Sequence, residues 1–145
     1  MATLPVAGRD YPATMQELSS WFHEEASCRR YLEQLRWPFG FACPTCGALD
    51  PWRTKDGALL CRACRKVTSV TAGTIFHRSH LPLTTWFAAI WLVTADKNGV
   101  SALALQRELG LGSYETAWSM LHRLRRAMVV PGRERLSGLV EVDEA

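Results

Sequence analysis

The sequence lacks the features of an exported or membrane-spanning protein. Its first residues have no basic start followed by an apolar run, so we expect no signal peptide. No stretch reaches the roughly 18 apolar residues of a membrane helix; the nearest, residues 81–95, contains several threonines and stops at Asp96. The five cysteines are an odd number, which argues against complete pairing in disulfides. We therefore expect an intracellular, reducing setting and no membrane.

The chain also lacks internal repeats, low-complexity segments and a large net charge. Its 145 residues are 48% hydrophobic, which indicates a folded chain with room for one ordinary domain or a few small modules. The net charge is only +3, but residues 43–80 carry six basic and two acidic residues, and residues 81–137 carry seven and four. This local surplus suits a phosphate backbone as partner, and an ordinary solvated surface explains it equally well.

Two Cys-x-x-Cys pairs are the strongest motif present. Cys43 and Cys46 form the first pair, and Cys61 and Cys64 form the second after 14 intervening residues. This spacing is typical of a tetrahedral four-thiolate site in which each pair forms one tight turn, or knuckle. Four thiolates leave no open position for water, so we expect Zn²⁺ in a structural role. Two disulfides, or iron bound by the same thiolates, are the alternatives.

The residues between and after the pairs predict β-strands. Asp56-Gly57 lies between strand-like segments, which predicts a hairpin with a type I′ turn. Residues 66–71 are rich in β-branched side chains and predict a third strand. Together these features predict a zinc ribbon over residues 43–80. His77 and His80 are spaced as a possible metal pair, but four thiolates already saturate a tetrahedral site.

Helical patterns flank the ribbon on both sides. Residues 1–13 read as a flexible leader, and residues 14–42 as a helical segment that opens with a capping box at Thr14. Cys28 falls on the apolar stripe of a helix from about Glu24 to Arg36, so we expect it to be buried and not a metal ligand. The aromatic residues of segment 37–41 should cover the ribbon. The predicted fold class is α+β.

Residues 81–130 predict a helix-turn-helix module. Ser101 and Ser113 are good N-caps, and Gly110 lies in the turn between the two helices that they open. In such motifs the second helix enters the major groove of DNA. The candidates for base contact are Tyr114, Glu115 and Ser119, and the candidates for phosphate contact are His122, Arg123 and Arg126. A three-helix unit that packs against protein is the alternative.

The last residues, 131–145, predict a linker and the beginning of a strand. Val140 and Val142 point to one side of that strand, and Glu141 and Asp143 point to the other. A two-residue apolar face on a lone strand provides no core. We expect either that a further domain follows or that these residues form a frayed acidic tail.

The ordered motifs of the chain resemble those of the ISXO-like insertion-sequence transposases, a bacterial DDE-type family. The resemblance covers about residues 15–145 and rests chiefly on Arg36-Trp-Pro38, Cys43-Pro-Thr-Cys46-Gly47, Thr71-Ala-Gly-Thr-Ile-Phe76, Thr116-Ala-Trp118 and Val140-Glu-Val-Asp143-Glu144. In that family a zinc ribbon and a helix-turn-helix precede a ribonuclease-H-like catalytic domain. The resemblance implies binding to double-stranded DNA at the terminal inverted repeats, on which the chain could form a homo-oligomer, and a cytoplasmic, nucleoid-associated location.

The same resemblance assigns Asp143 to the first catalytic carboxylate of a site that would use Mg²⁺ or Mn²⁺ in a full-length form. The other two acids are absent, and two-metal phosphoryl transfer needs several converging carboxylates. We therefore expect these residues to be the recognition part of a transposase, truncated where the catalytic domain begins and inactive alone. A stand-alone transcriptional regulator or transposition inhibitor, or a protein-interaction adaptor without DNA binding, are the other hypotheses.

Overall fold

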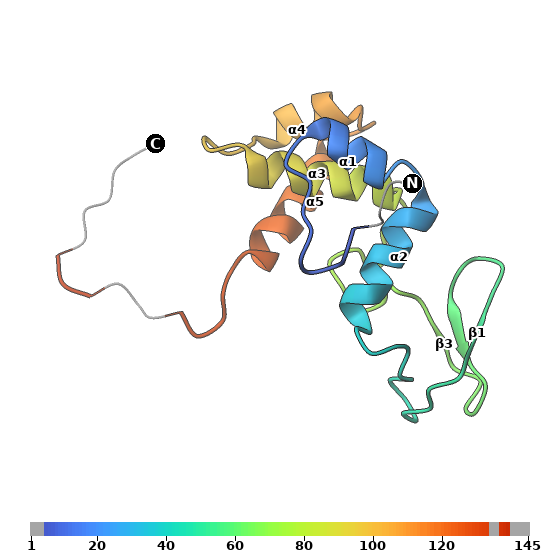
Figure 1. Cartoon of the computed structure of the whole chain (residues 1–145). Coiled ribbons are helices and arrows are strands. Elements are labelled where there is room, and N and C mark those ends of the chain that lie inside the picture. Colours follow the sequence, from blue (N-terminus) through green and yellow to red (C-terminus); the bar gives the residue numbers. More distant parts are fainter. Residues whose placement is uncertain (1–4, 134–136, 140–145) are drawn as a thin grey trace.

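The computed structural model describes residues 5–133 and 137–139 (Figure 1). Within them lie five helices and one antiparallel sheet of order β1-β2-β3. In chain order the elements are α1 (Met15–Trp21), α2 (Glu25–Arg36), β1 (Pro51–Arg53), β2 (Leu59–Cys61), β3 (Val67–Thr68), α3 (Leu83–Ala95), α4 (Ala102–Leu109) and α5 (Tyr114–Ala127). The α+β prediction is confirmed: a small sheet is inserted between two groups of helices.

Three helices begin at the N-caps that the sequence predicts. The hydroxyl of Thr14 accepts a hydrogen bond from the Glu17 N–H at 3.2 Å, and Ser101 and Ser113 do the same for α4 and α5. Each cap satisfies one of the backbone donors that a helix leaves unpaired at its N-terminus. Gly110 ends α4 with φ 61°, in the left-handed region that glycine adopts without steric cost. The turn between α4 and α5 is therefore fixed by local sequence.

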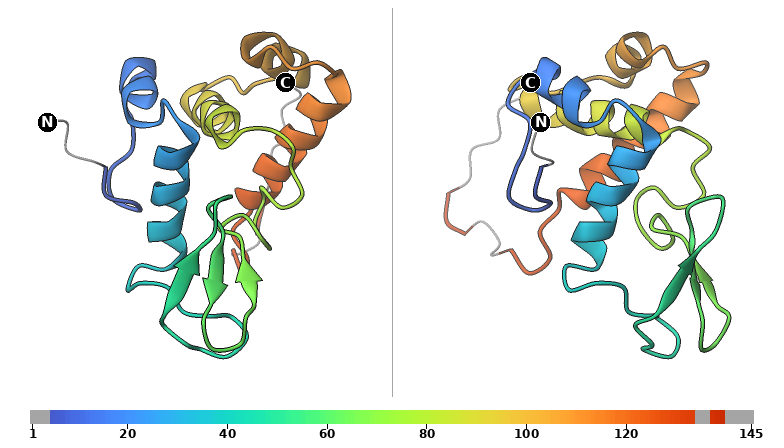
Figure 2. Two further views of the ribbon diagram at one scale, coloured as in Figure 1. Left: turned by 90° about the vertical axis from the view of Figure 1, so that its right-hand side faces the viewer. Right: turned by 45° about the vertical axis from the view of Figure 1, so that its right-hand side comes forward.

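One hydrophobic core unites the helices from both sides of the ribbon. Leu18 and Phe22 of the N-terminal segment belong to the same buried cluster as Trp86, Leu105 and Met120. The ring of Phe22 lies against that of Phe87 on α3, with centroids 4.6 Å apart. Residues 14–42 are therefore packed into the predicted helix-turn-helix module and do not form a separate core. In Figure 2, α1 and α2 lie along one side of α3, while α4 and α5 lie along the other.

The described part of the predicted flexible leader, residues 5–13, is anchored to this core. The Tyr31 hydroxyl of α2 donates to the Asp10 carbonyl at 2.8 Å, and the indole N–H of Trp91 on α3 donates to the Pro12 carbonyl at 3.3 Å. Composition alone predicted a loose segment because proline and glycine are frequent there. The partners of its carbonyls lie on helices distant in sequence.

The ribbon hairpin differs in detail from the prediction. Pro51 pairs with Cys61 and Arg53 with Leu59, so the strands are where the sequence places them. The turn is not type I′, since Gly57, with φ 77°, is its one residue of positive φ. The Gly57 N–H donates to the Thr54 carbonyl, and the Thr54 N–H donates to the Ala58 carbonyl. These bonds define a three-residue loop that ends in a left-handed glycine, the other common hairpin connection.

The third strand is shorter than predicted because its partner strand β2 extends no further. Strand β3 covers only Val67–Thr68, although β-branched residues continue to Thr71. The Arg36 guanidinium at the end of α2 donates to the carbonyls of Val70 at 2.9 Å and Ala72 at 2.6 Å. Strand β2 begins at Leu59, which pairs with Thr68, so the residues after Thr68 have no partner strand in the described sheet. In the described ranges, no helix is long and apolar enough to cross a membrane.

Candidate metal centre and nucleic-acid interface

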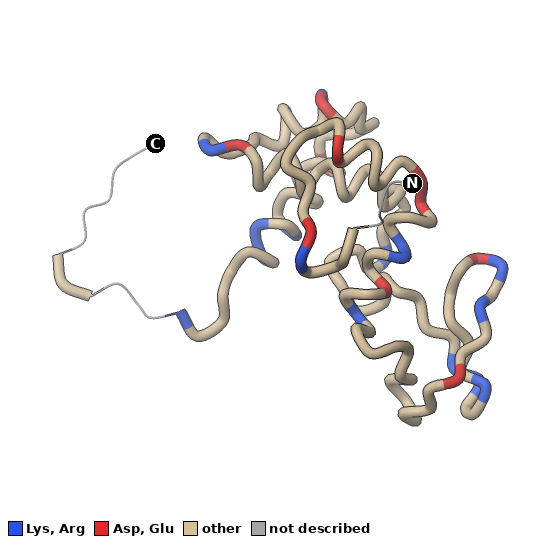
Figure 3. Tube along the Cα trace, in the orientation of Figure 1, with Lys and Arg blue, Asp and Glu red and all other residues tan. Residues whose placement is uncertain are grey.

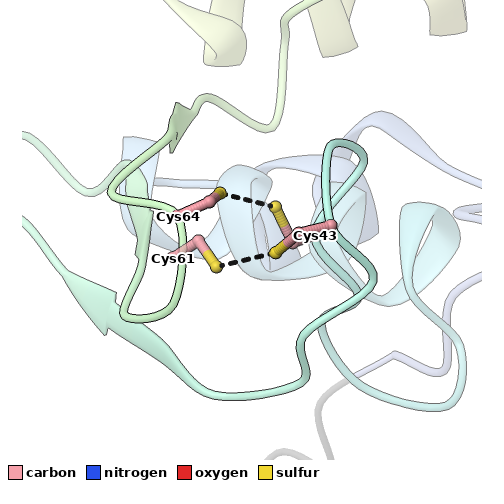
Figure 4. Close-up of side chains that lie close together, drawn as sticks. Cys43, Cys61 and Cys64 are labelled. Carbon is pink, nitrogen blue, oxygen red and sulfur yellow. Dashed lines mark hydrogen bonds between the residues drawn. The ribbon is translucent and has the colours of Figure 1, made fainter.

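The four cysteines of the two motifs meet at one end of the ribbon (Figure 4). Cys43 and Cys46 come from the loop before β1, and Cys61 and Cys64 come from the end of β2 and the turn that follows. The Sγ atoms of Cys43 and Cys64 are 3.6 Å apart, and those of Cys46 and Cys61 are 3.5 Å apart. All four sulfur atoms lie within 4.8 Å of one another.

This arrangement fits a tetrahedral zinc ion. With Zn–S bonds of about 2.3 Å, the sulfur atoms of a tetrahedron lie roughly 3.8 Å apart. The distances here are close to that value, and all five cysteines are free thiols, so two structural disulfides are excluded. Four thiolates form a closed site that holds an ion without offering it to a substrate. The ion would join the two knuckles and thereby stabilise a sheet whose strands are only two or three residues long.

Backbone N–H groups and neighbouring thiols shift the pKa values of Cys43 and Cys46 in opposite directions. The N–H groups of Cys46 and Thr45 lower the pKa of Cys43 to about 6. The Ala48 N–H lowers the pKa of Cys46, but the neighbouring Cys61 and Cys64 thiols outweigh it and raise that pKa to about 12. Four adjacent thiolates repel one another, which opposes their deprotonation. A bound divalent cation offsets this repulsion.

The fifth cysteine, Cys28, and the histidines His77 and His80 lie outside this site. Cys28 is fully buried in the helical core, and burial, aided by the charge of Glu25, raises the pKa of its thiol to about 12. Its interpretation as a buried apolar residue agrees with this environment. His77 accepts a hydrogen bond at Nδ1 from the Gly73 N–H. Neither His77 nor His80 belongs to the cysteine group, the one metal-ligating cluster found in the described part of the chain.

A second, smaller apolar cluster supports the metal site. Phe41, Cys43, Leu59 and Cys61 are buried together, and Trp37 packs against them. The rings of Trp37 and Phe41 meet edge to face with centroids 5.1 Å apart. The expectation that segment 37–41 covers the ribbon therefore holds for Trp37 and Phe41. It is wrong for Phe39, which is fully exposed.

In the described residues, polar side chains attach the ribbon to the helices at three places. Glu33 of α2 forms a two-pronged ion pair with Arg53 of β1, at 2.8 and 2.9 Å. Arg36 of α2 donates to the carbonyls of Val70 and Ala72, in the segment that follows β3. From the other side, Arg123 of α5 donates to the carbonyls of Ile75 at 3.1 Å and His77 at 3.0 Å. Two arginines from two helices thus fix the segment that leads from the ribbon to α3, and Figure 2 (left) shows α2 and α5 converging on the sheet.

The structure sorts the predicted DNA-contacting residues into two groups. Exposed on α5 are Tyr114, Glu115, Ser119, His122 and Arg126. Arg123 is only partly exposed, and its guanidinium holds backbone carbonyls of the same chain. These bonds give Arg123 a structural role, and its contact with phosphate stays a prediction. The helical wheel alone placed Arg123 on a flank and could not show which segment lies beside that flank.

The sequence interpretation missed Trp118. This side chain is 49% exposed on the same face of α5, and its ring lies 3.9 Å from that of His122. Tyr114, Trp118 and His122 are spaced four residues apart and form one aromatic stripe on the helix surface. That spacing was a usable signal. The predicted catalytic residue Asp143 lies outside the described residues.

Comparisons with known proteins agree with the fold and the metal site. Residues 23–67 match the family model of the transposase zinc-ribbon domain. The chain is 32% identical over 127 residues to an uncharacterized protein in transposable element ISH50 of Halobacterium salinarum. That alignment includes 85% of this chain and 42% of the relative, so the chain spans less than half of the relative's length. No solved structure matches the chain.

The fold and the four-cysteine site together define a zinc-ribbon protein with an attached helical module. More particularly, residues 23–67 match the transposase zinc-ribbon domain, and the chain is similar to a protein encoded in a transposable element. The resemblance found from the motifs is thereby confirmed.

Proposed function

We propose that this chain binds double-stranded DNA through the exposed face of α5 and recognises the terminal inverted repeats of an insertion sequence. The observation that supports this most is the aromatic and polar stripe on α5, formed by Tyr114, Trp118 and His122 with Ser119 beside it. Contiguous exposed apolar patches mark interaction surfaces. Helix α5 is also the second helix of the α4–turn–α5 unit, the position of a recognition helix.

Each side chain of this face has a suitable chemistry for a base edge or a backbone phosphate. Ser119 can donate to and accept from bases, and the ring of Trp118 can contact a thymine methyl group. Arg126, one turn after His122, suits a phosphate, which positions a protein without reading sequence. The tilted contact between the rings of Trp118 and His122 restricts both side chains before binding, so less side-chain entropy is lost on the DNA.

The test is a titration of the zinc-loaded chain against two duplexes. One carries the terminal inverted repeat of the insertion sequence, and the other is a scrambled duplex of equal length and composition. We expect tighter binding to the first duplex. Affinity should fall steeply with salt, because Lys and Arg side chains displace counterions from the DNA phosphates. Equal affinity for the two duplexes would reject recognition of the ends.

Variants of α5 distinguish residues that contact bases from residues that contact phosphates. Trp118→Ala should weaken binding to the end duplex about tenfold, which corresponds to about 1.4 kcal/mol, and reduce discrimination between the duplexes. Arg126→Ala should weaken binding to both duplexes equally and lower the salt dependence. Leu103→Ala is the matched control, since this exposed apolar side chain lies on α4 and not on the stripe. Loss of discrimination in the control would contradict the assignment of reading to α5.

We further propose that these residues bind DNA without cutting it. Phosphoryl transfer by two metal ions needs several carboxylates around ions about 3.5–4 Å apart. In the ranges that the structure describes, cysteines and not carboxylates form the cluster able to hold a metal. Incubation of the end duplex with the chain and Mg²⁺ or Mn²⁺ should leave both strands intact, as judged on a denaturing gel. Nicking at the element's end would contradict the proposal.

A further inference from the structure

The two knuckles of the metal site share one backbone design. In the first, the Gly47 N–H donates to the Cys43 carbonyl at 2.9 Å, and the Cys43 N–H donates to the Ala48 carbonyl at 3.0 Å. These two bonds close the loop around the first pair of thiols. Glycine is well suited to this loop, because φ at Gly47 is 74°, in the left-handed region.

The second knuckle repeats both bonds with different residues. The Arg65 N–H donates to the Cys61 carbonyl at 3.0 Å, and the Cys61 N–H donates to the Lys66 carbonyl at 2.9 Å. Arg65 therefore occupies the position that Gly47 occupies in the first knuckle, and Lys66 occupies that of Ala48. The residue after the first cysteine is Pro44 in one knuckle and Arg62 in the other.

The arginine is in an unfavourable backbone conformation. Its φ is 61°, where a side chain is crowded by the backbone and glycine is not. In the described part of the chain, the residues other than glycine with positive φ are Arg65 and Arg78, both arginines. Strained positions of this kind concentrate at functional sites, where the side chain is needed. The metal-binding geometry alone does not need arginine, since the first knuckle achieves it with glycine.

The exchange of residues gives the second knuckle a positive surface. Pro44, Gly47 and Ala48 carry no charge, whereas their counterparts are all basic. Those counterparts, Arg62, Arg65 and Lys66, are all exposed. Figure 3 shows basic residues recurring along the ribbon, both at the hairpin turn and at its opposite end.

In the described part of the chain, one of these three basic side chains has a carboxylate partner and the other two have none. Arg62 lies 3.4 Å from Asp50 and 5.5 Å from the centre of the Trp52 ring, and both side chains of this ion pair are more than half exposed. For Arg65 and Lys66, the described residues provide no carboxylate within 4.0 Å. Nor do these three side chains donate a hydrogen bond to a cysteine sulfur within that part of the chain. Direct hydrogen bonds to the thiolates therefore do not account for them.

We propose that the second knuckle, residues 61–66, is a phosphate-binding contact for the same DNA duplex that α5 binds. Arg62, Arg65 and Lys66 bind backbone phosphates, and α5 contacts bases. The attachment of the ribbon through Arg36 and Arg123 holds the two contact regions in fixed register. This inference rests on the proposed function, because it requires a duplex on α5.

The test replaces basic residues of the second knuckle by their uncharged counterparts from the first, which preserves the backbone conformation. The double variant Arg65→Gly, Lys66→Ala gives the second knuckle the residues of the first. Lys55→Ala, at the hairpin turn of the same ribbon, is the matched control for loss of charge. All three proteins are zinc-loaded and titrated by fluorescence anisotropy with the end duplex and the scrambled duplex over a range of salt concentrations. Zinc stoichiometry and thermal midpoint are measured in parallel.

We expect the double variant to lose at least tenfold in affinity for both duplexes and to retain their ratio. The slope of log K against log salt should become shallower by about 2, since each phosphate contact contributes about 0.9. Zinc stoichiometry should be unchanged and the thermal midpoint should rise, because glycine relieves the strain. Lys55→Ala should bind like the parent chain.

Two results would overturn the inference while leaving the proposed function standing. One is parental affinity and salt slope in the double variant, with discrimination by the parent chain intact. The other is loss of zinc from the double variant, which would assign the basic residues to the metal site. Failure of the parent chain to bind either duplex would overturn the proposed function and the inference together.

Discussion

Replacing Cys46 by alanine is expected to release the metal and unfold residues 43–71 while the helices remain folded. Three thiolates hold zinc much less tightly than four, and in zinc-finger peptides the ion contributes on the order of 10–16 kcal/mol. The ribbon has only a small apolar cluster of its own, whereas the helices share the large core around Trp86. Zinc content, measured by atomic emission, should fall well below one ion per chain. Amide exchange should accelerate in the ribbon but not in α3–α5.

Cys28→Ala is the matched control for this experiment, because it also removes a thiol. Cys28 is buried in the helical core, away from the four clustered sulfur atoms. Its replacement should leave zinc stoichiometry at one and cost only the small cavity that the lost sulfur leaves. A Cys46→Ala chain that retained one zinc ion and a protected ribbon would refute the four-thiolate assignment.

The second large effect is expected for Trp86→Ala. Trp86 is 2% exposed, its ring packs edge to face on Phe76, and its indole N–H donates to the Ser79 hydroxyl at 2.8 Å. Truncating a buried tryptophan typically costs about 3–5 kcal/mol. Such a loss is a large part of the stability of a small domain. Urea denaturation of the zinc-loaded chain, followed by circular dichroism, should show a greatly lowered midpoint.

Trp118→Ala is the matched control for the core and separates stability from binding. Trp118 is half exposed on α5, so its truncation should change the free energy of unfolding by less than about 1 kcal/mol. The pair of variants should therefore behave oppositely: one unfolds easily, and the other folds normally and binds the end duplex weakly. Equal midpoints for Trp86→Ala and the parent chain would contradict the single-core description.

Local sequence was sufficient to predict the elements whose causes are local. Ser101, Gly110 and Ser113 specify a cap, a turn and a second cap, and α4 and α5 begin or end where these residues lie. The cysteine spacing similarly predicted the metal ligands, because each knuckle is a closed loop of six residues. These signals depend on neighbours in the chain, which a sequence displays directly.

What the sequence could not show depends on contacts between distant segments. Arg36 and Arg123 looked like surface charges, but each donates to carbonyls more than thirty residues away. The length of β3 was overestimated for a related reason, since its partner strand β2 begins at Leu59, opposite Thr68, and provides no pairing beyond it. Likewise, nothing in residues 5–13 indicates that Tyr31 and Trp91 hold their backbone.

The hydrogen bonds from Arg36 and Arg123 to carbonyls of residues 69–77 limit where related chains can differ in length. Surface loops usually tolerate insertions and deletions at small thermodynamic cost. An added residue between Val70 and His77 would instead pull carbonyls away from one of the two guanidinium groups. Length differences among relatives should therefore fall in turns closed by local bonds, such as the Asp96–Gly99 turn after α3, and spare this connection.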